Sequence, residues 1–275
     1  MEKTKVLFIT HEMNPFTNLS VLGDIAHSLS KGLQKKDMEV RVFMPRFGKI
    51  NERRHRLHEV IRLSGINIQV GEDDNPMIIK VASLPSAKMQ VYFLDNEDLF
   101  KRKAYFRDEN EELFSDNDER MIFFNKGVME ILQKLEWNPD IVHCHGWFSS
   151  LVPVYGKTLY KDEPVFKDSR FLVTSYDEGL EENFGEQFFD KTLLNGEASD
   201  QQERLKNPAI KDLYKAGIDY ADGCALGSSE VSQELASFAK EKSNPLLELD
   251  KNQDENQIAE AYHDFYNKLL QKEKV

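Results

Sequence analysis

The segment KVLFIT, residues 5–10, decides the fold together with the stretch that leads from it to a second apolar run at residues 39–44. Four successive apolar residues at 6–9 predict a strand buried on both faces of a sheet. After a polar loop over 11–20, apolar residues recur at helical spacing, which predicts a helix over 24–36. This strand–helix–strand order is typical of the first unit of a doubly wound, Rossmann-like α/β sheet that is mostly parallel.

The middle of the chain is less regular. Residues 46–58 are basic and predict an exposed loop or helix, and 71–75 form a cluster of turn residues. Two apolar runs, 77–81 and 89–94, predict a hairpin or two adjacent strands. Other segments expected here are an acidic solvated loop at 108–118 and a helix with one apolar stripe over 121–135.

The α/β alternation returns after residue 140. The expected strands are 140–144, 170–175, 223–226 and 245–249, and the expected helices are 147–159, 210–220 and one from Ser228 or Ser229 to about 240. We expect a single domain over residues 1–275. Within it, a closing amphipathic helix in 250–275, started by a capping box of Asp254 and Gln257, is expected to pack on the same core.

Composition excludes several classes of protein. The chain has 40% hydrophobic residues and a net charge of −12, which suits a globular domain and argues against nucleic acid or anionic membranes as partners. No apolar run approaches the ~20 residues of a membrane span, and no signal-peptide pattern is present at the first strand. We therefore expect a cytoplasmic protein, in which Cys144 and Cys224 are free buried thiols.

Several blocks of the sequence, in order, resemble the bacterial glycogen and plant starch synthases, glycosyltransferase family 5. The blocks are KVLFIT (5–10) leading to Glu12, Pro15-Phe16 and LGD (22–24), VRVFMPRFG (40–48), YFLDN (92–96) before DER (118–120), PDIVHCH (139–145) running into Trp147, and KAGIDYAD (215–222). Together they span roughly residues 5–234. Their order along the chain sets them apart from a generic Rossmann likeness.

The resemblance implies one lobe of a two-lobed GT-B fold. It implies transfer of glucose from ADP-glucose to the non-reducing end of an α-1,4-glucan, with no metal and no other cofactor. In such a family the N-terminal lobe offers most of the acceptor surface, and the C-terminal lobe holds most of the nucleotide sugar. This sequence matches the N-terminal lobe and ends a few dozen residues after it, so we expect the donor-binding lobe to be absent from the chain.

The sequence departs from the family pattern where that family has its chemistry. The family's lysine corresponds to Asn18, and its paired glycines correspond to Ser20 and Val21, whose side chains restrict the backbone and block close approach. The His-Asp-Trp block becomes residues 145–147, and Thr-Ile-His-Asn becomes residues 174–177. No residue is expected to be catalytic. The expected vestigial pocket comprises Asn18, Ser20, Val21, Gly23, Asp24, His145, Gly146, Trp147, Tyr176 and Asp177.

Other readings of these residues remain open. His143 and His145 share one face of a strand and can be metal ligands or packing residues, but no third ligand lies near at the usual spacing. Asp24 suits a helix start better than a ligand contact. Trp147 can stack on a sugar or pack in the core. Two further alternatives are an acid/base pair in residues 176–178, against a polar loop, and a polymer contact in 46–58, against a solvated face.

Three functions are compatible with the sequence. The first is a synthase-like protein, non-catalytic on its own, that binds α-glucan or a protein of glycogen metabolism and regulates or scaffolds that metabolism. The second is one lobe of an active glycogen synthase whose other lobe is a separate polypeptide. The third is a stand-alone Rossmann module for an unrelated small molecule. The lost lysine and glycines favour the first over the second.

Overall fold

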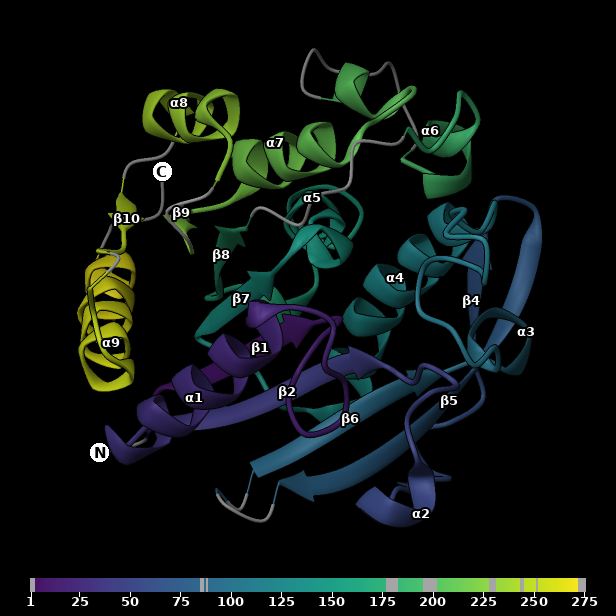
Figure 1. Ribbon diagram of the computed structural model, residues 1–275, viewed down its shortest axis with the longest axis horizontal. Coiled ribbons are helices and arrows are strands. Elements are labelled where there is room, and N and C mark those ends of the chain that lie inside the picture. The colour runs from purple at the N-terminus through teal and green to yellow at the C-terminus, as the bar shows by residue number, and fades with distance from the viewer. Residues whose placement is uncertain are drawn as a thin grey trace.

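The computed structural model describes residues 3–84, 87, 89–176, 183–194, 202–227, 231–242, 245–250 and 252–271 (Figure 1). Its strands are β1 (Lys5–Thr10), β2 (Glu39–Pro45), β3 (His58–Glu59), β4 (Ile66–Val70), β5 (Asp73–Leu84), β6 (Met89–Asp95), β7 (Ile141–His145), β8 (Arg170–Ser175), β9 (Gly223–Leu226) and β10 (Leu246–Glu248). Its helices are α1 (Val21–Lys35), α2 (Glu52–His55), α3 (Glu97–Phe100), α4 (Asn117–Leu135), α5 (Leu151–Lys157), α6 (Phe188–Thr192), α7 (Ile210–Tyr220), α8 (Gln233–Lys242) and α9 (Glu255–Gln271). Short 3₁₀ helices lie at Trp147–Ser149, Pro164–Phe166 and Gln202–Leu205.

The strands form one sheet in the order β10-β9-β8-β7-β1-β2-β6-β5-β3, and β4 pairs with β5. The first strand, β1, lies between β2 and β7 and is parallel to both. The sheet is parallel from β10 to β6, and β5 then runs antiparallel to β6, β4 and β3. The predicted doubly wound, mostly parallel α/β class is confirmed. Its strand order changes direction beside β1, where this fold class places ligands.

Helices cover both faces of the sheet (Figure 1). On one face, α1 and α9 pack against each other, and tyrosines of α9 reach His143 of β7. On the other face α4, α5 and α7 pack side by side, and α5 is so close to β8 that a Cβ on Gly156 would lie 2.3 Å from the ring of Phe171. The core between these layers contains fully buried Val6–Ile9 side chains. Apolar runs in the central strands are therefore explained by burial on both faces.

The structure corrects several predicted elements. The helix expected at 147–159 is present but shorter, because a 3₁₀ turn ends at Ser149 and α5 spans only Leu151–Lys157. Pro153 explains the break, since a continuous helix would force its ring against the carbonyl of Ser149. The turn expected at 71–75 is shorter, because β5 already begins at Asp73. Strand β4 was not predicted, although its residues alternate between apolar and polar.

Two surface assignments also change. In the basic segment 46–58, Phe47 and Ile50 are buried, and Arg46 Nε lies 2.9 Å from Asp95 Oδ2 in a largely buried ion pair. The segment is therefore only partly an exposed face. In the acidic segment 108–118, Asp118 is buried at the start of α4.

The last helix, α9, is held by close packing and by hydrogen bonds. Asp254 Oδ1 accepts from the backbone N–H of Gln257, and Gln257 Oε1 accepts from that of Asp254, both at 2.9 Å, so the predicted capping box is present. Where α9 crosses α1, a Cβ on Gly32 would lie 2.6 Å from the Cβ of Ala259. Tyr262 is fully buried, as are two other α9 side chains, Tyr266 and Leu269.

Both cysteines are free and buried, Cys144 in β7 and Cys224 in β9, as predicted. Within the described ranges, we find no helix with the length and apolar character required to cross a membrane.

Candidate functional site

A cleft opens at the carboxyl ends of the central strands, close to the reversal of strand order at β1. Its volume is about 890 Å³, within the usual ~300–1,000 Å³ of ligand pockets. The loop after β1, the segment 102–114 and the turn after β7 supply nearly all of its lining. Because ligands of doubly wound proteins bind at this edge of the sheet, the cleft is the candidate functional site.

The loop after β1 is organised around the buried carboxylate of Glu12. The backbone N–H groups of Leu19 and Ser20 both donate to Glu12 Oε1, the second at 2.5 Å, and Ser20 Oγ donates to Oε2 at 2.8 Å. A Cβ on Gly23 would lie 3.0 Å from Glu12 Oε1, so the glycine leaves room for the carboxylate. These amides form a cradle for an anion, and a side chain of the protein occupies it.

The predicted pocket residues of this loop have distinct positions. Ser20 caps α1, since its hydroxyl accepts from Leu22 N at 3.1 Å, and it also lines the cleft. Asp24 lies in the first turn of α1 and accepts a hydrogen bond from Asn14, which favours the helix-start interpretation. Asn18 is exposed, and Val21 is 66% exposed at the helix start. Leu19 is exposed too, whereas the Leu22 side chain is buried in the core.

The carboxyl end of β7 carries His145, which does not line the cleft. His145 Nδ1 lies 3.0 Å from the hydroxyl oxygen of Tyr176, and both side chains are buried. Burial lowers the pKa of His145 to about 3, so the imidazole is neutral at neutral pH. Gly146 comes next with a φ of +78°, which favours glycine, and turns the chain toward Trp147.

The shared face predicted for His143 and His145 is correct, because their ring centroids lie 3.7 Å apart. Both nitrogens of His143 are engaged, Nδ1 with Tyr266 Oη and Nε2 with Thr174 Oγ1, each at 2.6 Å. Burial, and then the neighbouring His145, lower the pKa of His143 well below its ordinary value. The pair is therefore part of a buried hydrogen-bond network that joins β7 and β8 to α9, and His143 has no nitrogen left for a metal.

Tyr176 packs tightly at the end of β8. A Cβ on Gly227 would lie 2.4 Å from its ring, so a glycine is needed beside it. Its backbone N–H donates to the hydroxyl of Tyr214 at 3.3 Å. The predicted partner Asp177 lies outside the described residues. Of the predicted pocket residues that the structure describes, Ser20 and Trp147 line the cleft.

The ring of Trp147 combines the two roles considered for it. It is 1% exposed and packs against Phe106 and Phe184, with centroid distances of 5.1 and 5.4 Å, so packing is its main role. Its edge contributes to the cleft lining. It can therefore contact a ligand only through the small part of the ring that is exposed.

The facing wall was missed by the sequence analysis. It is formed by Arg102, Tyr105 and Phe106, and Lys49 Nζ lies over the Tyr105 ring, 4.9 Å from its centroid. Burial, and then the charge of Glu12, raise the pKa of Tyr105, so its hydroxyl keeps its proton. The sequence carried a signal for this wall, because residues 101–107 combine four basic side chains with two adjacent aromatic ones. The wall offers flat rings together with hydrogen-bond donors.

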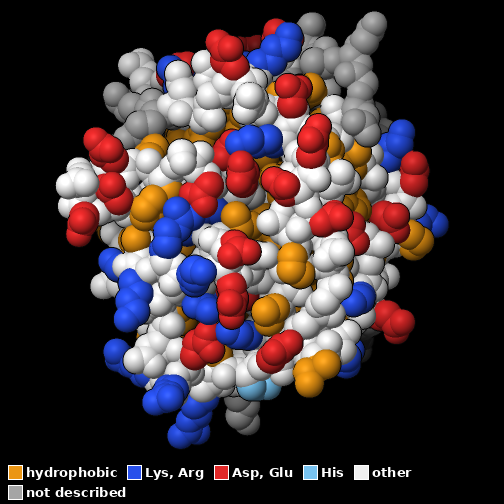
Figure 2. All heavy atoms as spheres, turned by 90° about the vertical axis from the view of Figure 1, so that its right-hand side faces the viewer, with side chains coloured by type: hydrophobic (Ala, Val, Ile, Leu, Met, Phe, Trp, Pro, Cys, Tyr) orange, Lys and Arg blue, Asp and Glu red, His pale blue; other side chains and the backbone are white. Residues whose placement is uncertain are grey.

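The surface on the right-hand side of Figure 1 carries charges of both signs. Figure 2 shows lysine and arginine side chains gathered toward the lower left of this face and acidic side chains across its centre. Hydrophobic side chains lie between them in small groups. Such a mixed face lacks the uniform positive charge with which proteins bind nucleic acids.

Comparisons with known proteins all match this chain to starch and glycogen synthases. The family model described as "Starch synthase catalytic domain" matches residues 5–248. A glycogen synthase of Chlorobium luteolum is 41% identical over 236 residues, covering 84% of this chain and 47% of that protein, and one of Chlorobium phaeobacteroides is 39% identical over the same length and shares. The chain thus spans about half the length of these curated relatives.

A solved structure has the same fold. The catalytic domain of Starch Synthase IV from Arabidopsis thaliana, bound to ADP and acarbose, superposes with a TM-score of 0.75 and 18% sequence identity. The match covers 90% of this chain and 51% of the Arabidopsis chain.

Proposed function

Because the chain belongs to the starch synthase catalytic domain family and corresponds to its N-terminal lobe, we propose that its cleft binds α-1,4-glucan and that the 275-residue chain by itself does not transfer glucose. One arrangement supports both parts of the proposal. The aromatic cleft beside β1 is open, whereas the neighbouring backbone amides are already occupied by Glu12.

Glucan binding rests on the chemistry of the cleft. A glucose unit has apolar C–H faces and a rim of hydroxyl groups, so it suits aromatic rings flanked by a few polar side chains. The cleft offers Tyr105 and Phe106 on one wall, the edge of Trp147 on its floor and the ammonium group of Lys49. The Arabidopsis relative was solved with acarbose and ADP bound, which supports testing a carbohydrate and a nucleotide side by side.

The lack of turnover rests on the loop after β1. Glucose transfer from ADP-glucose must stabilise negative charge that grows on the leaving diphosphate, and preorganised donors and cations usually supply most of that stabilisation. Asn18 stands where the family has a lysine. The amides of Leu19 and Ser20 are engaged by Glu12, and the first residue of α1 is Val21, whose side chain is exposed. We therefore place this lobe in glycogen metabolism as a glucan-binding or regulatory module.

Titration calorimetry with maltoheptaose and with ADP-glucose tests the proposal. We expect maltoheptaose to bind, and Tyr105→Ala to weaken binding about two- to tenfold, the range for one aromatic contact. Tyr220→Ala, at the end of α7 and outside the cleft lining, serves as the matched control and should leave affinity unchanged. Absence of glucan binding, or equal losses in both variants, would contradict the proposal.

A second candidate is favoured by the length comparison. The relatives are about twice as long as the matched segment, and in this second candidate the lobe described here forms an active glycogen synthase together with a donor lobe. Mixing the chain with a donor lobe taken from a Chlorobium glycogen synthase, then measuring ADP release with glycogen present, distinguishes the two. Turnover in the mixture that neither part shows alone would favour this second candidate.

A further inference from the structure

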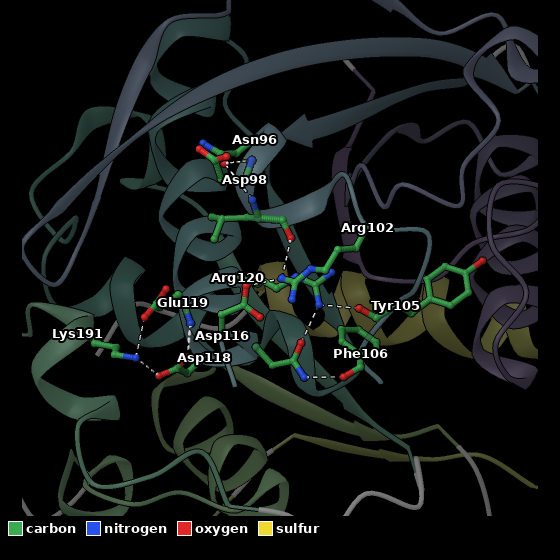
Figure 3. Close-up of polar contacts among 12 residues, drawn as sticks. Asn96, Asp98, Arg102, Tyr105, Phe106, Asp116, Asp118, Glu119, Arg120 and Lys191 are labelled. Carbon is green, nitrogen blue, oxygen red and sulfur yellow. Dashed lines mark hydrogen bonds and ion pairs between the residues drawn. The ribbon is translucent and has the colours of Figure 1, made fainter. Parts of the chain in front are cut away.

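A buried arginine stands behind the aromatic wall of the cleft. Arg120, on the first turn of α4, is fully buried and lies among the rings of four phenylalanines at 5.1–5.9 Å. Its Nη1 donates to the carbonyl oxygen of Tyr105 at 2.6 Å and to Asn117 Oδ1 at 2.7 Å (Figure 3). One nitrogen thus joins the backbone of the cleft wall to the start of a core helix.

Asn117 completes the attachment. Its Nδ2 donates to the carbonyl oxygen of Phe106 at 2.8 Å, next to the carbonyl that Arg120 holds. The backbone N–H of Phe114 donates to the same Phe106 oxygen at 3.0 Å, which closes the loop between these two residues. Two successive carbonyl groups of the wall are therefore fixed by two side chains of α4, and their orientation sets where the rings of Tyr105 and Phe106 lie.

The electrostatics show that this arrangement is costly to maintain. Arg102 points toward the same cluster and pairs with Asp116 (Figure 3). The pKa of Arg120 is lowered to about 10 by burial and then by repulsion from Arg102, and the charge of Asp116 offsets this lowering only in part. Nε and Nη2 of Arg120 have no hydrogen-bond partner among the described residues. A buried cation whose hydrogen bonds are incomplete stabilises a fold less than an apolar side chain of similar size would.

We propose that Arg120, with Asn117, is a positioning residue that holds the Tyr105–Phe106 wall in the conformation that receives a ligand. The significance for glucan rests on the proposed function, whereas the ordering of residues 101–116 does not. A further anchor of this helix end is Lys191, whose Nζ contacts Asp118 and Glu119 at 2.6 and 2.9 Å. Loss of Arg120 is therefore expected to release the cleft wall and leave that anchor in place.

Lys126 offers a matched control on the same helix. Its Nζ also donates to a backbone carbonyl, that of Gln69 at 2.6 Å, and its side chain is also largely buried. This carbonyl belongs to β4, away from the cleft lining. Lys126→Met thus removes a comparable cation–carbonyl bond without touching the wall.

Hydrogen exchange of the full chain tests the proposal. In Arg120→Met and in the milder Asn117→Ala, we expect amides in residues 101–116 to exchange about tenfold faster, as the loss of one charge-assisted bond implies. Arg120→Lys keeps a nitrogen that can donate to both oxygens and should retain most of the protection. Lys126→Met should accelerate exchange around 66–70 instead. Unchanged exchange at 101–116 in both wall variants, or the same acceleration there in Lys126→Met, would overturn the proposal.

Maltoheptaose titration of the same variants adds a readout that general destabilisation does not move. We expect weaker binding in Arg120→Met, partial recovery in Arg120→Lys and wild-type affinity in Lys126→Met. If the wild-type chain binds no maltoheptaose, the proposed function fails, and the exchange data still decide the role of Arg120. If glucan binds equally to all variants although exchange differs, the wall is held by Arg120 but does not receive the ligand, which overturns the positioning role.

Discussion

Acidification should destabilise the protein through its buried histidine pair. The pKa of His145 is about 3 in the folded chain, against 6.5 for an ordinary histidine, because the ring is fully buried. Below pH 6.5 the unfolded chain therefore binds a proton that the folded chain does not, and the free energy of unfolding falls as the pH falls. Burial raises the pKa of Tyr262 and of Tyr266 on α9, so these neighbouring tyrosines do not ionise in this range and do not mask the effect.

The magnitude is set by that difference in pKa. From pH 7 to pH 5, His145 alone should lower the free energy of unfolding by about 2 kcal/mol, at ~1.36 kcal/mol per pKa unit. The pKa of His143 is shifted in the same direction, so its contribution adds to this loss. For a chain of this size, ~2 kcal/mol corresponds to a fall of roughly 4–8 °C in melting temperature.

Urea unfolding at pH 7, 6 and 5 measures this dependence. His145→Gln cannot titrate and should show a shallower decline between pH 6 and 5, by about one proton, whatever its stability at pH 7. Leu29→Ala, a core substitution without a titrating group, is the control and should keep the wild-type slope although it lowers the stability. If the wild type is equally stable at pH 7 and 5, or if His145→Gln has an unchanged slope, the reasoning from burial is refuted.

Three further outcomes are expected. Ending the chain after Asp250 removes the buried side chains of α9 and should lower the melting temperature by at least about 10 °C, because each large buried side chain contributes ~1.5–3 kcal/mol to the free energy of unfolding. An unchanged melting temperature would mean that α9 does not contribute to stability. Gly32→Leu should destabilise the chain by about 1–3 kcal/mol in urea, because its side chain collides with Ala259, whereas wild-type stability would show that the two helices separate freely. Asn18→Lys combined with Val21→Gly should not produce ADP release from ADP-glucose with glycogen, and steady turnover by that variant or by the wild-type chain would contradict the catalytic part of the proposal.

Local patterns in the sequence predict the limits of those helices and strands whose ends depend on neighbouring residues in the chain. Residues 210–220 and 223–226 have the predicted limits because helical spacing and a short apolar run define them. Helix α1 begins at Val21, earlier than predicted, because the Ser20 hydroxyl caps it. The hairpin of β5 and β6 is confirmed, but β5 starts earlier because a turn at Gly71 pairs it with β4.

The candidate site is harder to predict because it depends on contacts between distant segments. Residue types identify the loop after β1 as part of the site. They do not predict that the Glu12 carboxylate accepts hydrogen bonds from the backbone amides of Leu19 and Ser20, because the sequence shows Glu12 only as one residue of a block shared with the family. The cleft wall at Tyr105 depends on Arg120, fifteen residues later in the chain, and on its phenylalanine surroundings. Periodicity carries no information about such side chain–carbonyl bonds. His145 and Tyr176 are expected in one pocket, and they meet as a buried hydrogen-bonded pair outside the cleft lining.

The two buried thiols can report how often the central sheet opens. Cys144 and Cys224 are its only cysteines and lie in the interior of the sheet, where burial raises the pKa of Cys144 well above its ordinary value. A thiolate-specific reagent should leave the folded chain unmodified. Because the two sulfur atoms lie on strands that flank β8, modification should add both labels together whenever the sheet opens. Mass spectrometry of the doubly labelled fraction over time would then monitor the opening of the central sheet in native buffer, without denaturant or an engineered probe.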